Sequence, residues 1–416
     1  MAPAFDIAPP GSFEICADPA FQADAVAELS EVAGCAREAL AAFEPLGLIL
    51  AGSLARGEGT VVARRDGTAS WLSDIECIAV FPDATRDFRT IDAALRALEA
   101  SFNSDPGRAS RGVHLEVRAI TAAKFSRMRE AIFSREMLAN GKLLWGVPER
   151  IAAPRWASAP PAIPPIDALR LLVNRVAERL ELRLAAEAGA LAPDALAYRN
   201  AKFWIDLATS LSVFLGCYLP GYRARETALV KRLGRAPRIL DAAASELLLG
   251  HLRDAMEVKL GAGPRDGSGL SASLDAGAQA GAWALRWETD RMLGGDAGGD
   301  GWDWIPRRLR RVESRRQRAR DWGRLWLRTG RGACFAAPWP AVMLGYGSPT
   351  AAIYSAACLL DFFWNDAGTG KPPADALVKS LARLFGVKPA APAATRSKLA
   401  EAALRAWTAH VRFNAA

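Results

Sequence analysis

Two short stretches hold the residues best suited to chemistry. Gly52-Ser53 ends an apolar run, and a glycine there lets the backbone turn sharply and approach a phosphate. Asp74 and Glu76 lie two residues apart at the start of a second apolar run, so in a strand they point to the same side of the sheet. Two carboxylates there are costly without a cation between them, and their hard oxygen ligands suit Mg²⁺.

A third acid, Glu116, lies in an alternating stretch at 112–120 that predicts another strand. His114 and Arg118 share its face, and a lone histidine there is more often a packing or hydrogen-bonding residue than a base. If this strand lies beside the first acidic pair, three carboxylates converge near the glycine turn. That arrangement suits phosphoryl or nucleotidyl transfer, because two Mg²⁺ ions can bridge the carboxylates and a triphosphate.

A structural interpretation competes with the catalytic one. Asp74 can cap or pair locally, and Glu76 and Glu116 can bind arginines such as Arg118. Arg56, shortly after the glycine turn, can either contact a phosphate through its planar fork or lie in solvent on a helix. The residues alone leave both interpretations open.

Together these motifs resemble the signature of the DNA polymerase β-like nucleotidyltransferase superfamily, on two segments: Gly52-Ser53 with Arg56-Gly57-Glu58, and Ser73-Asp74-Ile75-Glu76. The resemblance covers roughly residues 45–150. It implies an α+β fold in which a mixed sheet is flanked by helices. It also implies transfer of a nucleoside monophosphate from an NTP to a hydroxyl acceptor, with release of pyrophosphate.

The resemblance assigns Asp74, Glu76 and Glu116 as ligands of Mg²⁺ (or Mn²⁺), and Glu116 as a group able to take the acceptor's proton. It places the β- and γ-phosphates against Ser53 and the backbone of Gly52. The second acid is a glutamate where many members have aspartate, which lengthens the ligand by one methylene. The two motifs are also further apart than in minimal members, and a hairpin at 60–72 accounts for the added length.

A lysine on a helix after the catalytic domain contacts the triphosphate in similar enzymes, and Lys202 on the expected helix 194–217 is our candidate; a surface lysine is the alternative. Two tyrosines and two arginines follow this helix and are candidates for an acceptor or phosphate contact: Tyr218, Tyr222, Arg223 and Arg225. An arginine there can equally cap the helix carbonyls.

The periodicity predicts a mixed N-terminal domain followed by an almost wholly helical region. We expect a flexible lead-in at 1–20, a nucleotidyltransferase domain at 21–150, a Pro-rich linker at 151–165, a helical domain at 166–295 and an Arg/Trp-rich helical region at 296–416. The expected C-terminal helices are 166–188, 194–217, 224–236, 239–259, 272–293, 305–328, 350–365, 373–386 and 396–412.

The formal net charge of +8 is concentrated in one segment. Between Arg307 and Arg331, eleven arginines accompany two acidic residues, so this segment carries +9 and the rest of the chain is about neutral. A solvated, salt-bridged helix face, a site for an anionic partner such as RNA or an acidic glycan, and a membrane-surface helix all fit this pattern. Four tryptophans can either stack on bases or fill the core: Trp302, Trp304, Trp322 and Trp326.

Six scattered cysteines without a CxxC motif predict buried free thiols, with neither a zinc site nor a disulfide framework. The N-terminus shows no signal-peptide pattern, so we expect a cytoplasmic protein. The uncharged stretch 332–360 contains several prolines and glycines, which favours a helical core over an integral membrane span. The alternative to a transferase is a catalytically silent protein of the same fold that binds nucleic acid or a partner.

Overall fold

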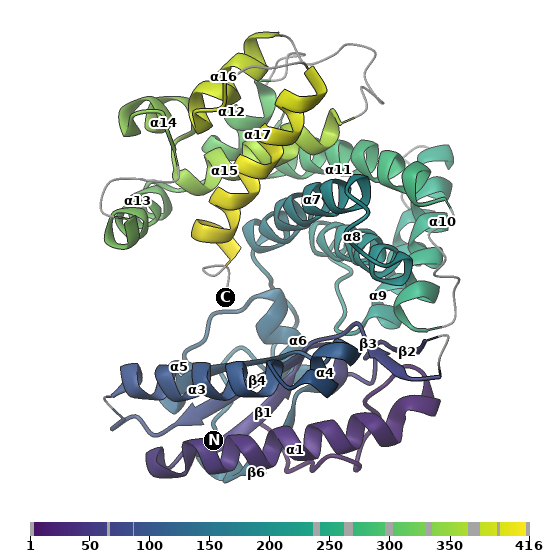
Figure 1. Cartoon of the computed structure of the whole chain (residues 1–416), viewed down its shortest axis with the longest axis vertical. Coiled ribbons are helices and arrows are strands. Elements are labelled where there is room, and N and C mark those ends of the chain that lie inside the picture. The colour runs from purple at the N-terminus through teal and green to yellow at the C-terminus, as the bar shows by residue number, and fades with distance from the viewer. Residues whose placement is uncertain are drawn as a thin grey trace. The chain divides into compact units, whose positions relative to one another are not determined.

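The computed structural model describes residues 4–64, 67–85, 87–235, 242–261, 269–295, 303–329, 335–364, 375–388 and 392–412. The chain divides into two compact units (Figure 1). The sheet unit comprises Met1–Pro164, Cys217–Ala236 and Met256–Pro264. The helical unit comprises Pro165–Gly216, Pro237–Ala255 and Arg265–Ala416. The predicted α+β class is confirmed.

A four-stranded mixed sheet forms the centre of the sheet unit, in the order β5-β4-β1-β6. Its strands are β1 (Gly47–Ala51), β4 (Ile75–Phe81), β5 (Leu115–Thr121) and β6 (Lys142–Gly146). β1 runs antiparallel to β4 and β6, whereas β4 and β5 are parallel. The predicted hairpin is present as β2 (Val61–Ala63) and β3 (Ala69–Trp71), although Asp66 of its turn lies outside the described residues.

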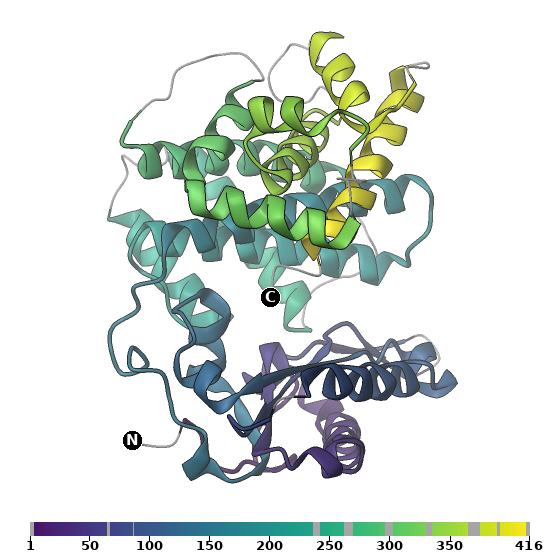
Figure 2. The same cartoon turned by 90° about the vertical axis from the view of Figure 1, so that its left-hand side faces the viewer.

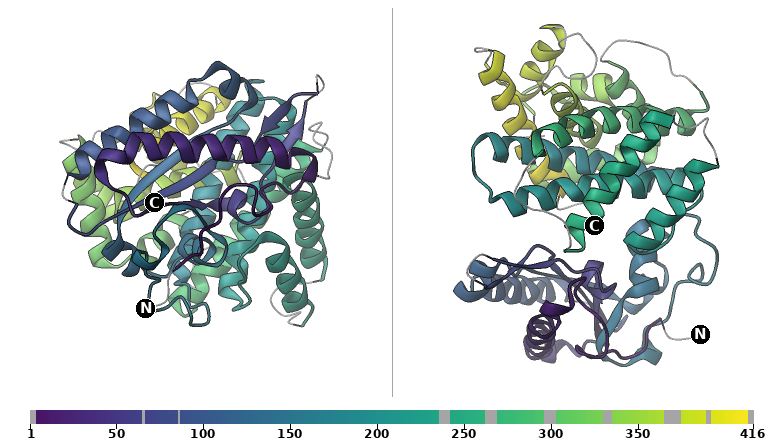
Figure 3. Two further views of the ribbon diagram at one scale, coloured as in Figure 1. Left: turned by 90° about the horizontal axis from the view of Figure 1, so that it is seen from below. Right: turned by 90° about the vertical axis from the view of Figure 1, so that its right-hand side faces the viewer.

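The two faces of the sheet carry separate hydrophobic cores. The long helices α1 (Gln22–Leu40) and α3 (Phe88–Asn103) pack with the odd-numbered residues of β4 (Figure 3, left, where α1 lies in front of the strands). Phe125 of α5 (Ala122–Ser126) and Met137 of α6 (Ile132–Asn140) pack with even-numbered residues of β4. This alternation is what a strand period of two requires. It puts Glu76 on the α5–α6 side.

The N-terminal segment, which we expected to be a flexible lead-in, packs on the sheet unit. Phe5 and Ile15 are buried in the two cores. Bridges pair Ile7 with Leu143 and Cys16 with Gly59. The unit is completed by short helices: α2 (Gly52–Ala55), α4 (Pro106–Arg111), α9 (Tyr222–Gly234) and the 3₁₀ turns Pro19–Phe21, Ala41–Phe43 and Pro148–Arg150.

The helical unit contains long helices packed on one another (Figure 3, right). They are α7 (Pro165–Glu187), α8 (Pro193–Phe214), α10 (Ala242–Lys259, whose last turn belongs to the sheet unit), α11 (Leu270–Leu293), α12 (Trp304–Val312), α13 (Arg315–Thr329), α14 (Trp339–Tyr346), α15 (Pro349–Phe362), α16 (Asp375–Phe385) and α17 (Pro392–Trp407), followed by a π turn at Thr408–Arg412. Most of the two helical regions that we separated at residue 295 falls in this one unit, but residues 217–236 and 256–264 of the first region belong to the sheet unit.

The predicted helix 305–328 is in fact two helices, α12 and α13. Glu313 adopts an extended conformation (φ −80°, ψ 131°) and ends α12. Ser314 and Gln317 then cap each other reciprocally: the Gln317 backbone N–H donates to Ser314 Oγ (3.2 Å), and the Ser314 N–H donates to Gln317 Oε1 (2.7 Å). This capping box starts α13. Helix α14 was not predicted, because prolines and glycines surround it.

Among the described residues, no helix is long and apolar enough to cross a membrane. Five cysteines in this part of the chain are free, and three of them are buried: Cys16, Cys77 and Cys358. Burial raises the pKa of the Cys77 thiol to about 12, as expected for an inert core cysteine. Cys334 and Trp302 lie outside the described residues.

Candidate functional site

Glu76 and Glu116 are direct partners in the parallel β4–β5 ladder. Side chains at paired positions of neighbouring strands point to the same face. The sequence pattern therefore placed Glu116 on the correct side, together with Glu76. Glu76 is half-buried, whereas the Glu116 side chain is 48% exposed.

Asp74 lies at the entrance to β4, just before the ladder begins. The Ile75 N–H donates to the His114 carbonyl oxygen (2.8 Å), which holds the two strand entrances together. The Asp74 side chain is 48% exposed, and its Oδ1 lies 3.6 Å from His114 Nδ1. All three acids thus come from one end of two adjacent parallel strands.

For Asp74 and Glu116, the competing structural interpretation is supported only by long contacts between exposed side chains. Arg118 Nη2 lies 3.8 Å from Glu116 Oε2, and both side chains are about half exposed. The Asp74–His114 pair is comparably long and exposed. Pairs of this kind contribute about 0–1 kcal/mol to stability. The contacts with His114 and Arg118 therefore leave Asp74 and Glu116 in reach of a ligand from solvent.

Gly52 lies directly against the Glu76 carboxyl group. Ala51, the last residue of β1, pairs with Glu76 across the antiparallel ladder, so the turn begins beside that acid. Gly52 has φ +71°, and a Cβ added there would lie 3.0 Å from Glu76 Cδ. Only a residue without a side chain fits both the backbone conformation and the space. The Gly52-Ser53 motif and the Asp74/Glu76 motif are thus in direct contact in the structure.

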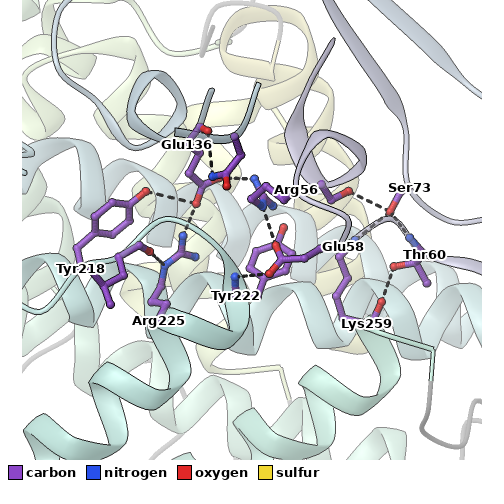
Figure 4. Close-up of polar contacts among 12 residues, drawn as sticks. Arg56, Glu58, Thr60, Ser73, Glu136, Tyr218, Tyr222, Arg225 and Lys259 are labelled. Atoms are coloured by element: carbon purple, nitrogen blue, oxygen red, sulfur yellow. Dashed lines mark hydrogen bonds and ion pairs between the residues drawn. The ribbon is translucent and has the colours of Figure 1, made fainter. Parts of the chain in front are cut away.

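A buried lysine lies beside the turn at Gly52-Ser53 (Figure 4). Lys259 Nζ is 3.0 Å from Ser73 Oγ, which in turn is 3.2 Å from Ser53 Oγ. The Thr60 hydroxyl donates to the Lys259 carbonyl oxygen (2.5 Å) and holds the end of α10 in place. A lysine is therefore connected, through the Ser73 hydroxyl, to the serine expected to contact phosphate.

Lys259 is a lysine of the sheet unit itself that lies at this site, whereas the role expected for Lys202 stays a prediction. Lys202 belongs to α8 in the helical unit, and its Nζ lies 5.8 Å from the centroid of the Tyr198 ring. Sequence reasoning missed Lys259 because a lysine in the last turn of a helix is most simply explained by favourable interaction with the helix C-terminus. No local signal connects it with a serine 186 residues earlier.

Arg56 takes neither of the two positions considered from the sequence, an open phosphate contact or a solvated helix face. Its side chain is buried (4% exposed) between two carboxylates. Arg56 Nε donates to Glu58 Oε2 (2.7 Å), and Nη1 donates to Glu136 Oε2 (2.8 Å). The guanidinium also stacks on the Tyr222 ring, 4.5 Å from its centroid. These contacts commit Arg56 to the interior of the sheet unit.

Glu136 is the centre of this buried cluster (Figure 4). It accepts hydrogen bonds from Arg56 and Arg225, and the Tyr218 hydroxyl lies 3.4 Å from its Oε1. Burial favours the neutral acid, but the two arginines outweigh it and lower the pKa of Glu136 below its ordinary value. Glu136 was absent from the sequence-based candidates.

Three of the four residues considered for an acceptor or phosphate contact form hydrogen bonds within the sheet unit. Tyr218 and Arg225 belong to the Glu136 cluster, and the Tyr222 N–H donates to Glu58 Oε1 (2.7 Å). They hold α9 within the sheet unit. Arg223 instead lines a separate pocket of about 630 Å³, whose other walls include residues 11–14.

The three acids fit a hard divalent cation by donor chemistry. Carboxylate oxygens suit Mg²⁺ or Mn²⁺, and the neighbouring turn contributes backbone N–H groups. In the part of the chain that the structure describes, no three His, Cys, Asp or Glu side chains are close enough together to hold a metal. The Asp74 and Glu116 carboxylates lie nearest His114 and Arg118, at 3.6 and 3.8 Å.

No protein-family model matches this chain, and the searches of curated proteins and of solved structures also produced no match.

Proposed function

We propose that the sheet unit is a Mg²⁺-dependent nucleotidyltransferase domain that moves a nucleoside monophosphate from an NTP to a hydroxyl acceptor and releases pyrophosphate. The observation that carries this proposal is the pairing of Glu76 with Glu116 across β4 and β5, with Glu76 in contact with the Gly52 turn. A pair of acids on neighbouring strands with no such turn nearby would support a structural interpretation equally well.

Asp74, Glu76 and Glu116 would hold the cation, which supplies neutralisation of the triphosphate charge when bound. The protein's own groups then position the substrate. The backbone N–H groups at Gly52-Ser53 bind phosphate oxygens, and the Lys259 ammonium adds a fixed positive charge beside them. Because phosphoryl chemistry depends mainly on positioning and electrostatics, this set meets its main requirements.

Glu116 is the group best placed to take the proton of the acceptor hydroxyl. It is half-exposed on the open part of the sheet face, whereas Glu76 is half-buried against the turn. A general base must reach the substrate, so exposure favours Glu116 for this role. Asp74 and Glu76 then act as ligands only.

The proposal is tested with α-labelled NTPs, Mg²⁺ and the full chain, measuring nucleotide binding and pyrophosphate release. We expect Asp74→Ala to lower the rate by about 10³-fold, since a metal ligand contributes several kcal/mol of transition-state stabilisation. Asp92→Ala is the matched control, because Asp92 is an exposed aspartate on α3 that pairs only with Arg96 among the described residues. Neither binding nor pyrophosphate release by the wild-type chain, or equal rates in the two variants, would refute the proposal.

A further inference from the structure

Helices α13 and α14 together present an unusual surface in the helical unit, here called the α13–α14 surface (Figure 2, the green helices facing the viewer). Five large apolar side chains on it are exposed: Trp326 (50%), Leu327 (90%), Trp339 (48%), Met343 (40%) and Leu344 (68%). Single exposed apolar residues are ordinary, but a contiguous group of them marks an interaction site.

Tryptophan contacts join the two helices. Trp339 of α14 lies 6.0 Å from Trp326 and 6.3 Å from Trp322 of α13, measured between ring centroids. Helix α14 contains no charged residue, and Val342 is its one buried side chain. A helix of this composition would normally be buried in a core. We therefore expect its exposed apolar side chains to bind an apolar partner.

The remainder of α13 is strongly basic. It contains six arginines and one aspartate, Asp321, which is engaged by Thr350 and His410. Four of the arginines are exposed and form no ion pair with any residue that the structure describes: Arg315, Arg316, Arg320 and Arg324. Within the described part of the chain, these four arginines are therefore solvated but not salt-bridged. The charge of α13 is complementary to an anionic partner.

We propose that the α13–α14 surface docks on an anionic lipid bilayer, lying in the interface without crossing it. The exposed arginines match acidic headgroups, and the tryptophans suit the headgroup level. Leu327 and Leu344 provide the aliphatic contacts that enter the acyl boundary.

The combination of side chains favours a bilayer over two other occupants. Single-stranded nucleic acid uses basic and aromatic side chains, but has no need of exposed leucine and methionine. A second copy of this chain would bring one arginine-rich helix against another. The inference does not depend on the proposed transferase activity, because it concerns the other unit.

The test measures co-sedimentation of the full chain with phosphatidylcholine vesicles, with and without phosphatidylserine. We expect at least about tenfold stronger binding to the anionic vesicles, and weakening of that binding by salt. Absence of binding to anionic vesicles would overturn the proposal.

Two variants separate the apolar and the charge contributions. Leu327→Gln/Leu344→Gln keeps the charge and should weaken vesicle binding about tenfold, whereas Leu247→Gln, at an exposed leucine of α10, should not. Arg320→Gln/Arg324→Gln should weaken binding by a similar factor, and Arg232→Gln/Arg253→Gln should have little effect. All these positions are exposed, so thermal melts of the variants should match the wild type.

Three results would contradict the proposal. Loss of binding in the arginine variant with unchanged binding in the leucine variant would show adsorption by charge alone. Tight binding of an RNA oligonucleotide without vesicle binding would identify a nucleic-acid surface. Concentration-dependent dimerisation that the leucine variant abolishes, again without vesicle binding, would identify a self-association surface.

Discussion

Glu116 and Glu136 are glutamates of the same unit, but the fold treats their charges in opposite ways. Glu136 is buried and bound by two arginines and a tyrosine. Glu116 is half-exposed, and its nearest cation among the described residues, Arg118, lies 3.8 Å away. The protein neutralises the first charge by itself, whereas the second has only this long, exposed contact with a cation among the described residues. This contrast separates a carboxylate that stabilises the fold from one available to a ligand.

The same contrast applies to the cations. Arg56 lies between Glu58 and Glu136 and is part of the buried cluster. Lys259 contacts the hydroxyl of Ser73 at the edge of the acidic site. The sequence motifs suggested Arg56 as a phosphate ligand because it lies close to Gly52-Ser53 along the chain. In the structure, the carboxylates that neutralise Arg56 distinguish it from Lys259. We therefore expect mutations in the two clusters to affect different measurements.

The largest effect on stability is expected at Glu136. Glu136→Gln leaves Arg56 and Arg225 buried without their shared carboxylate, which should lower the free energy of unfolding by about 3–5 kcal/mol. Glu116→Gln should change it by less than about 0.5 kcal/mol, because its partner is distant and exposed. Denaturant unfolding of both variants measures the difference. Equal stabilities would remove the distinction between the two carboxylates.

The local pattern was sufficient for the position of Glu116. Alternation along 114–118 determines which side chains share a face, and the ladder confirms that choice because neighbouring strands keep the same period. Helical periodicity likewise predicted α7, α8, α9 and α11 to within a few residues of the observed ends. These features depend on contacts within one element or between adjacent strands.

Other features depend on partners far apart in the chain. Glu136 meets Arg225, and Ser73 meets Lys259, only after α9 and the end of α10 join the sheet unit. Nothing in their own sequence neighbourhoods encodes these pairs. Ile15 is similar: the N-terminal segment has no clear period, yet its side chain is fully buried.

A second buried carboxylate extends the comparison to the helical unit. Among the described residues, Glu288 has no cationic partner, and it accepts a hydrogen bond from the Ser210 hydroxyl (2.7 Å). Burial raises the pKa of Glu288 to about 8. The folded state therefore holds a proton that the unfolded state releases above its ordinary pKa near 4.5. Stability from this group is present at low pH and is lost as pH rises from about 5 to 8.

Glu288→Gln removes this dependence because glutamine does not titrate. Between pH 5 and pH 8, the stability of the variant relative to the wild type should rise by roughly 3 kcal/mol. Chemical unfolding of both proteins at several pH values measures the change. A constant difference across this range would show that Glu288 is ionised in the folded protein.

Addition of Mg²⁺ should show whether the acids of the candidate site, Glu76 and Glu116, bind a cation. A ligand at about 100 times its Kd stabilises the folded protein by about 2.7 kcal/mol, so Mg²⁺ should raise the Tm of the wild type. Glu76→Gln/Glu116→Gln should lose this shift, and EDTA should reverse it in the wild type. K⁺ at matched ionic strength is the control. A shift retained in the double variant would place the cation elsewhere.

The smallest and most local prediction concerns Gly52. Gly52→Ala and Gly67→Ala both place a side chain at positive φ, +71° and +81°, which costs about 1–2 kcal/mol at either position. A Cβ at Gly67 meets nothing within 4 Å, whereas one at Gly52 lies 3.0 Å from Glu76 Cδ. The two variants should therefore lose similar stability, but only Gly52→Ala should also displace the Glu76 carboxylate.

Their pyrophosphate-release rates should then differ by at least about tenfold, since displacement of a ligand by about 1 Å can cost 10²-fold in rate. Unfolding curves and rates on the same preparations provide both numbers. If the two variants lose activity equally, the contact between the glycine turn and Glu76 is only a packing feature. The turn would then no longer distinguish the three acids from an ordinary charged sheet edge.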